Sequence, residues 1–201
     1  MKKTKILTLI LSLVLLLALL CSCNSGKPYE KSLSNLLDSL KACNFDRAEE
    51  YVWGDGDLID GLDEDELTSQ SRDFYKTMFS SLEYRIISSE MKDDTTAEIK
   101  VEITNVDIAP ALEKFLEEAF SYIIENMYGG DDDKTEAEIE RILAECVKNT
   151  KLETFTREVT VEVKKDEGEW KVVVGEADFA DAISGGMLSS FKDMFGSLIT
   201  D

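Results

Sequence analysis

The chain has 201 residues, of which 42 are acidic and 22 basic, so its formal net charge at pH 7 is −20. A charge this negative argues against DNA, RNA and anionic lipid headgroups as direct partners. The chain contains no histidine, which excludes Ser-His-Asp and Cys-His catalysis, histidine-bound zinc and a histidine proton shuttle.

The first 22 residues have the pattern of a secretory signal peptide. Three lysines precede an apolar stretch, 6–20, of roughly 15 residues, which is shorter than the roughly 20 that a membrane-spanning helix needs. The stretch ends in Leu20-Cys21-Ser22-Cys23, which resembles the lipobox cut by lipoprotein signal peptidase. The small side chain of Ser22 predicts cleavage before Cys23 and lipidation of the Cys23 sulfur. The alternative is an ordinary signal peptide or an uncleaved anchor, with Cys23 incidental.

Cleavage there would leave residues 23–201 held by lipid on the extracytoplasmic face of the cell membrane, because acyl chains give durable anchoring without a spanning segment. The signal contains three of the 22 basic residues and none of the 42 acidic ones, so the remaining 179 residues carry a net charge of −23. This charge favours solubility and repulsion from an anionic surface; the sharper alternative is a cationic partner or divalent ions. Residues 23–28 are predicted to be a tether and 29–201 a single domain.

Apolar spacing of three and four predicts helices, and strict alternation predicts strands. The predicted helices span residues 29–43, 46–52, 64–81, 110–128, 135–149 and 179–199, the last interrupted at Gly185-Gly186. The predicted strands span residues 83–91, 97–106, 153–165 and 169–174. Thr135 with Glu138 has the spacing of a capping box. The strongest helical stripe comprises Leu112, Phe115, Leu116, Ala119, Phe120, Ile123, Ile124 and Met127.

Helices followed by antiparallel hairpins indicate an α+β fold. We expect N-terminal helices packed on a curved antiparallel sheet, a two-helix insertion at about 108–150 between the hairpins, and a helical C-terminal tail. The tail has an apolar stripe that packs on the domain or, alternatively, binds a partner. That stripe comprises Met187, Leu188, Phe191, Met194, Phe195 and Leu198.

Two stretches resemble the NTF2-like (cystatin-like) superfamily. Residues 37–51, LDSLKACNFDRAEEY, resemble its first-helix turn, and residues 168–173, GEWKVV, resemble its late strand. Secreted Firmicute lipoproteins of uncharacterised function in that superfamily have a similar length and lipobox. The resemblance implies a sheet that wraps a long N-terminal helix and leaves a conical pocket, which the inserted helices would leave open, cap or fill.

The sequence offers few candidate site residues. Trp170, entering from a turn, is predicted to anchor the core. Trp53 and Tyr84 are candidates for a pocket or its mouth, or else further core and rim aromatics. Cys43 and Cys146 would form a disulfide or remain two buried thiols.

The acidic loop 54–65 invites a calcium assignment, but Ile59 takes the fifth position of the twelve-residue calcium loop and Asp60 replaces its glycine. We therefore predict a solvated acidic loop, no metal site and no cofactor.

Three functions are compatible with the sequence. The first is a non-enzymatic module that binds a small ligand or a protein partner, and the second is a structural envelope subunit that oligomerises. The third is an enzyme with a carboxylate base in the cone, which the absence of a convergent catalytic cluster disfavours. A cavity lined by a buried carboxylate would favour the enzyme. A filled cone with an exposed apolar patch would favour the interaction module.

Overall fold

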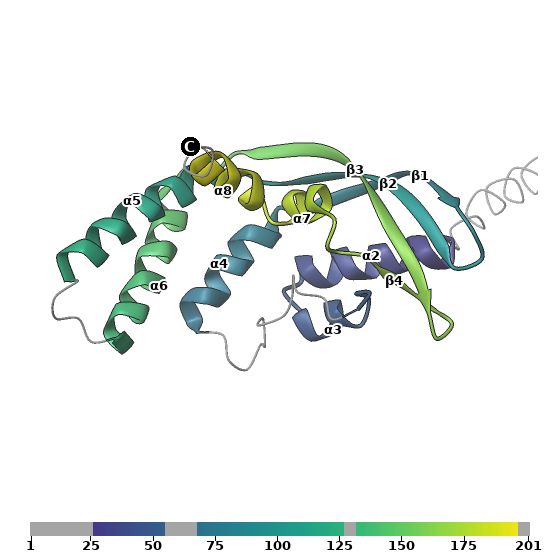
Figure 1. Cartoon of the computed structure of the whole chain (residues 1–201), viewed down its shortest axis with the longest axis horizontal. Helices are drawn as coiled ribbons and strands as arrows, with labels where there is room; N and C mark the ends of the chain where they lie inside the picture. The colour runs from purple at the N-terminus through teal and green to yellow at the C-terminus, as the bar shows by residue number, and fades with distance from the viewer. Residues whose placement is uncertain (1–25, 55–67, 127–131, 197–201) are drawn as a thin grey trace, which may run out of the picture.

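A computed structural model describes residues 26–54, 68–126 and 132–196, and these confirm the α+β fold. The described helices are α2 (Pro28–Lys41), α3 (Phe45–Glu49), α4 (Ser69–Ser80), α5 (Ala109–Asn126), α6 (Asp132–Asn149), α7 (Ala177–Ile183) and α8 (Met187–Gly196). The described strands are β1 (Glu83–Met91), β2 (Thr96–Val106), β3 (Thr154–Asp166) and β4 (Glu169–Val172). Figure 1 shows the helices gathered around one curved sheet.

The four strands form an antiparallel sheet in the order β1-β2-β3-β4. The ladder between β2 and β3 runs the whole length of β2 and joins the two predicted hairpins into one sheet. The turn from β3 to β4 passes through Glu167 and Gly168, which have φ of 48° and 99°. Two consecutive residues with positive φ match the right-handed twist of a tight hairpin, and glycine adopts such values without steric cost.

β1 forms an edge of the sheet, and the edge is irregular. Its register with β2 shifts between Ile86 and Ser88, so Ile87 is left out of the ladder as a bulge. The Lys27 ammonium donates to the carbonyl of Ser89 at 3.1 Å and to its hydroxyl at 2.8 Å. The N-terminal end of α2 therefore partly covers this edge.

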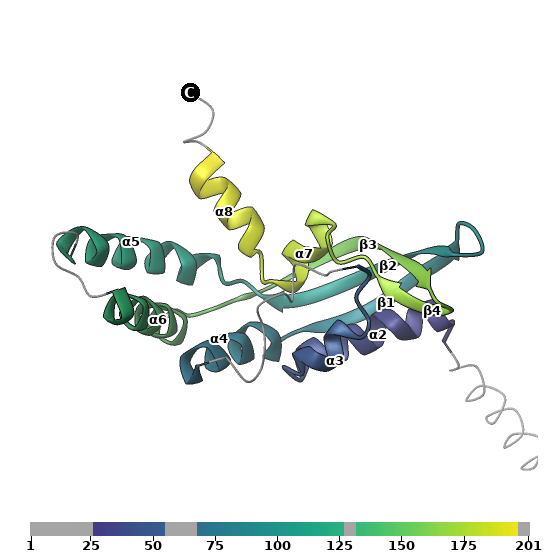
Figure 2. The same cartoon turned by 60° about the horizontal axis from the view of Figure 1, so that its bottom comes forward.

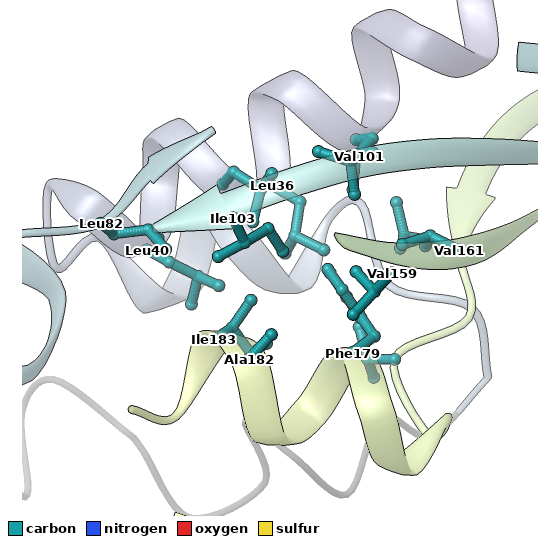
Figure 3. Packing of buried hydrophobic residues seen from close by; sticks show 14 of the residues in the cluster. Leu36, Leu40, Leu82, Val101, Ile103, Val159, Val161, Phe179, Ala182 and Ile183 are labelled. Carbon is teal, nitrogen blue, oxygen red and sulfur yellow. The ribbon is translucent and has the colours of Figure 1, made fainter. Parts of the chain in front are cut away.

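The core lies on one face of the sheet, as the alternation in the sequence predicts. Ala97, Ile99, Val101 and Ile103 of β2 are fully buried, and so are Val161 and Val163 of β3. α2 adds Leu33, Leu36, Leu37 and Leu40, and α7 adds Phe179, Ala182 and Ile183 to the same cluster. Figure 3 shows side chains from both helices meeting those of the strands. These apolar side chains pack the space between α2, α7 and the sheet, where a conical pocket would lie.

α2 is built to begin and end where it does. Pro28 occupies the first helical turn, where its missing N–H costs nothing. The helix stops before Cys43, whose φ is +51°, and Asn44 then caps α3 by accepting a hydrogen bond from the Arg47 amide at 2.9 Å. The hydroxyl of Ser32 donates to the Trp170 carbonyl at 2.5 Å, so α2 is fixed to β4 at mid-length.

α5 and α6 form a helical arm between β2 and β3. They contact each other, and α6 also contacts α4. In Figures 1 and 2 the arm occupies one end of the molecule, whereas the first described residues of α2 lie at the opposite end. The arm therefore extends the β2–β3 ladder outward and does not fill the interior. α6 begins at Asp132, so the predicted capping box is wrong: Thr135 lies inside the first turn of the helix.

The tail folds back onto the root of the arm. The Ile108 amide donates to the Gly185 carbonyl at 3.0 Å, and a β-carbon at Gly185 would lie 2.6 Å from the Val106 carbonyl oxygen. Asn105, fully buried, donates its side-chain amide to the Ile183 carbonyl at 2.8 Å. α7 is thus part of the core, and α8 leaves it at the break predicted by Gly185-Gly186 and contacts α5.

Candidate interaction surface

The predicted pocket aromatics hold elements together. The Tyr84 hydroxyl donates to a carboxylate oxygen of Asp38 at 2.9 Å, which joins β1 to α2. Burial raises the pKa of Tyr84, and the Asp38 carboxylate adds to the rise. The Trp53 amide donates to the Val172 carbonyl at 2.9 Å, and the Lys164 ammonium lies 5.9 Å from the centre of the Trp53 ring. Both aromatics are half-buried.

Trp170 lies at the edge of the core. Its ring meets that of Tyr29 edge to face, with 5.3 Å between the centroids. The side chain is half-buried and packs against the core cluster. The indole therefore closes the sheet end next to α2, with the Lys165 ammonium 6.0 Å from its ring centre.

The two cysteines of the domain lie on separate elements and are not bonded to each other. Cys43 is half-buried in the turn after α2. Cys146 of α6 is 1% exposed, and burial, helped by the nearby Glu118 carboxylate, raises the pKa of its thiol. A raised pKa keeps Cys146 protonated and unreactive.

Several predicted features lie outside the described residues: the cleavage site at Ser22, the lipidation site at Cys23 and most of the acidic loop 54–65. Within the described parts of the chain, no three His, Cys, Asp or Glu side chains are grouped as metal ligands would be. None of the described helices is long and apolar enough to cross a membrane.

An open groove of about 1230 Å³ lies between the start of α2 and β1. Its polar side chains are engaged with one another. Lys27 binds Ser89, and the Ser89 hydroxyl donates to the Glu30 carboxylate. None of the described residues that line the groove has a buried side-chain N or O atom without a hydrogen-bond partner, so nothing in it points to a ligand.

The exposed apolar side chains of the described helices lie on α5 and α8. On α5, Phe120 is 66% exposed, Ile123 47% and Ile124 53%. On α8, Leu188 is 41% and Phe191 36% exposed. Since the two helices contact each other, we refer to these five residues as the α5–α8 surface. In Figure 2, α8 rises beside the root of α5, and of the described elements only α6 lies along the distal half of α5.

Carboxylates border this surface on α5. Glu113 and Glu117 precede Phe120 by seven and three residues, which places them in the same row as Phe120 and Ile124 along the helix. Neither glutamate forms an ion pair with a cation of the described residues. Lys114, the cation nearest to them in the sequence of α5, is 3.8 Å from Glu118.

Two described cations of the arm, Lys114 and Arg141, are paired with carboxylates of their own helices. Arg141 of α6 binds Glu138 and Glu145 of its own helix at 2.5 and 2.6 Å. Both carboxylates hold the pKa of the Arg141 guanidinium above its usual range. Glu113 and Glu117 form no ion pair with a described cation and so place two negative charges beside exposed apolar carbon.

The sequence locates the apolar stripe of α5 but not its exposure. Leu112 and Ala119 of that stripe are buried, whereas Phe120, Ile123 and Ile124 are exposed. Periodicity shows which side chains share a face, and only the path of neighbouring elements decides what covers that face. In the tail, Met187 and Met194 pack against the core, whereas Leu188 and Phe191 are exposed.

Comparisons with known proteins give little further information. No protein-family model and no curated protein matches the chain. Among solved structures, the chain is similar to the crystal structure of a candidate lipoprotein (ycdA) from Bacillus subtilis, with 11% identity and a TM-score of 0.39. The similarity covers 72% of this chain and 44% of the Bacillus subtilis chain, so this chain matches less than half of that protein's length.

Proposed function

We propose that the protein is a lipid-anchored, non-enzymatic module of the extracytoplasmic membrane face that binds a protein partner through the α5–α8 surface. The observation that carries the proposal is the exposure of Phe120, Ile123 and Ile124, three large apolar side chains on one stripe of α5. An apolar stripe on a helix is ordinarily buried against another element. Exposure of these apolar side chains to water is unfavourable in free energy, and a partner that covers the stripe would remove this unfavourable exposure.

The filled interior supports binding at the surface over binding in a cone. Leu36 from α2 and Phe179 from α7 meet Val101 and Val161 of the sheet in one buried cluster. An NTF2-like enzyme or small-molecule binder would use that space for its ligand. The NTF2-like relationship itself rests on the sequence resemblance at residues 37–51 and 168–173.

The orientation of the molecule also suits this role. A lipid on Cys23 would hold the chain by the end at which α2 begins. The helical arm lies at the opposite end (Figure 1), so the α5–α8 surface would point away from the bilayer. A surface so placed meets soluble or envelope-bound proteins and not the membrane that carries the anchor.

The test is site-specific photo-crosslinking in a Gram-positive host that lipidates the full chain. p-Benzoylphenylalanine replaces Ile123 on the α5–α8 surface and, as the matched control, Thr160 on the exposed face of β3. We expect one discrete heterologous adduct from position 123 and none from position 160. The Phe120→Ser variant should lose the adduct, because exposed aromatic anchors dominate such contacts.

The other functions predict different results. An adduct of the chain with itself from position 123 would replace the proposal with a structural role in oligomers. Equal adducts from both positions, or none from position 123, would overturn it.

A further inference from the structure

We infer that the partner segment bound by the α5 residues of the α5–α8 surface is a cationic amphipathic helix. Its apolar stripe is flanked by lysine or arginine. This inference rests on the proposed function and names the chemistry of the partner at the same surface. It follows from the juxtaposition, on α5, of exposed apolar side chains with two carboxylates that form no ion pair with a described cation.

The shape of the face suits a helix. Phe120, Ile123 and Ile124 are spaced by three and four residues, so they form a ridge along α5. Ridges of this spacing pack into the grooves of a second helix. Beyond the root of the arm, α6 lies along one side of α5, and no other described element lies along the opposite side (Figure 2). An amphipathic helix laid along that opposite side would bury the ridge.

The carboxylates beside the ridge favour a partner segment with positive charge. Glu113 and Glu117 continue the row of Phe120 and Ile124 toward the start of α5 and form no ion pair with described cations. A partner helix lying on the ridge would place its flanking side chains beside these carboxylates. Lysine or arginine there gains charge-assisted hydrogen bonds, whereas acidic side chains would be repelled.

The same charges disfavour two other occupants. A second copy would bring Glu113 and Glu117 against their own equivalents, in a chain whose net charge is −20 before processing. An anionic bilayer would be repelled for the same reason. Of the described cations of the arm, Lys114 and Arg141 are paired with glutamates of their own helices, and none forms an ion pair with Glu113 or Glu117.

The test uses the full lipidated chain in nanodiscs of zwitterionic phosphatidylcholine. The probe is an 18-residue helical peptide with a leucine stripe flanked by lysines, and its counterpart replaces every lysine with glutamate. Calorimetric titration is corrected by titration into empty nanodiscs. We expect the lysine peptide to bind, with an affinity that falls as salt rises, and the glutamate peptide not to bind.

Two double variants test which carboxylates of the chain contribute to peptide binding. Glu113→Gln with Glu117→Gln keeps the shape of both side chains and removes two charges, and should weaken the lysine peptide roughly three- to tenfold. Glu49→Gln with Glu50→Gln removes the same charge from exposed positions at the end of α3 and should change binding less than about twofold. Ile124→Ser should weaken binding without altering its salt dependence.

The outcomes separate this inference from the proposed function. If position 123 captures a discrete partner in cells but the glutamine pair at 113 and 117 leaves both that adduct and peptide binding unchanged, the cationic partner is wrong and the proposed function stands. If position 123 captures no partner, both fail. Equal binding of the two peptides, concentration-dependent dimers lost in Phe120→Ser, or binding of anionic vesicles through position 123 would each overturn the inference.

Discussion

The carboxylate of Asp181 on α7 accepts a hydrogen bond from the backbone N–H of Ser189 on α8, at 2.8 Å. The second carboxylate oxygen of Asp181 binds the Arg157 guanidinium of β3. One nearly buried side chain thus caps the start of α8 and ties it to the sheet across the Gly185-Gly186 break. This contact fixes where α8 stands beside α5.

Removal of this carboxylate should loosen α8. We expect Asp181→Ala to lower the free energy of unfolding by about 2 kcal/mol, because it removes a helix cap and leaves Arg157 without its partner. Asp181→Asn keeps an acceptor for the Ser189 amide and should cost about 1 kcal/mol. Urea unfolding followed by tryptophan fluorescence measures both, with the exposed Asp193→Asn as the control. Equal costs at positions 181 and 193 would contradict the capping role.

The same contact predicts a pH dependence. Burial by itself would raise the pKa of Asp181, but the Ser189 amide and the Arg157 guanidinium outweigh it and lower the pKa below its ordinary value. A carboxyl whose pKa is lower in the folded state stabilises the fold above its unfolded pKa of about 3.9. The difference in stability between the wild-type chain and Asp181→Asn should therefore hold at neutral pH and shrink as the pH falls through the folded pKa. A difference that grows on acidification would reverse the assignment.

Two leucines separate the core from the α5–α8 surface. Leu36 is fully buried between α2 and the sheet, whereas Leu188 is 41% exposed on α8. Leu36→Ala should cost about 3 kcal/mol, because it leaves a cavity in packed surroundings. Leu188→Ala should cost less than about 0.5 kcal/mol. Urea unfolding of the two variants gives the comparison, and a large cost at Leu188 would mean that this side chain is part of the core.

A comparison of two glycines with similar φ separates the cost of the backbone conformation from the cost of a steric clash. Gly54 has φ of +76° with open space around it, and Gly185 has φ of +70° with the Val106 carbonyl oxygen 2.6 Å from the position of a β-carbon. Gly54→Ala should cost about 1 kcal/mol from the backbone conformation alone. Gly185→Ala adds the clash and should cost at least about 2 kcal/mol more. Thermal unfolding of the pair measures the difference, and equal costs would show that the tail yields at this point.

The thiol of Cys146 should resist alkylation in the folded chain. It is 1% exposed and its pKa is raised by burial, so the reactive thiolate is scarce and out of reach. We expect peptide-resolved iodoacetamide labelling at Cys146 to be at least roughly tenfold slower in the native chain than in urea. Equal rates in the two states would contradict its burial, and recovery of a peptide that joins Cys146 to Cys43 would establish the disulfide instead.

Lipidation at Cys23 has its own control in the neighbouring Cys21. Cys23→Ser should abolish incorporation of an alkyne-tagged fatty acid and leave the signal peptide uncleaved, since the sulfur is the site of acylation. Cys21→Ser should retain both labelling and processing. The measurement is in-gel detection of the label together with the mass of the chain. Labelling that survives Cys23→Ser, or is lost with Cys21→Ser, would contradict the assigned lipobox.

The strands were predictable because their signal is self-contained. The alternation of Ala97, Ile99, Val101 and Ile103 with charged or polar neighbours has one solution, a sheet with one buried face, and all four side chains are buried. The break in the tail helix at Gly185-Gly186 was predictable for the same reason. Such patterns depend only on residues close in sequence.

The surface was not predictable in the same way. The stripe of α5 has the same periodicity where Leu112 is buried as where Phe120 and Ile124 are exposed. The difference arises because β2 carries α5 beyond the end of the core, which is a matter of tertiary arrangement. Likewise, nothing in the sequence around Tyr84 indicates that Asp38, 46 residues away, accepts a hydrogen bond from its hydroxyl.

The bulge in β1 has a consequence for crowding. Chains tethered to a bilayer, as proposed here, diffuse in two dimensions and collide far more often than free ones, and each collision offers one regular sheet edge to another. In this chain Ile87 interrupts the edge and Lys27 occupies the Ser89 carbonyl. The β1 strand of a neighbouring chain would therefore not meet a continuous row of backbone donors and acceptors with which to pair. On the proposed membrane anchor, neighbouring chains would therefore stay separate at high surface density, and contacts would be left to the helical arm.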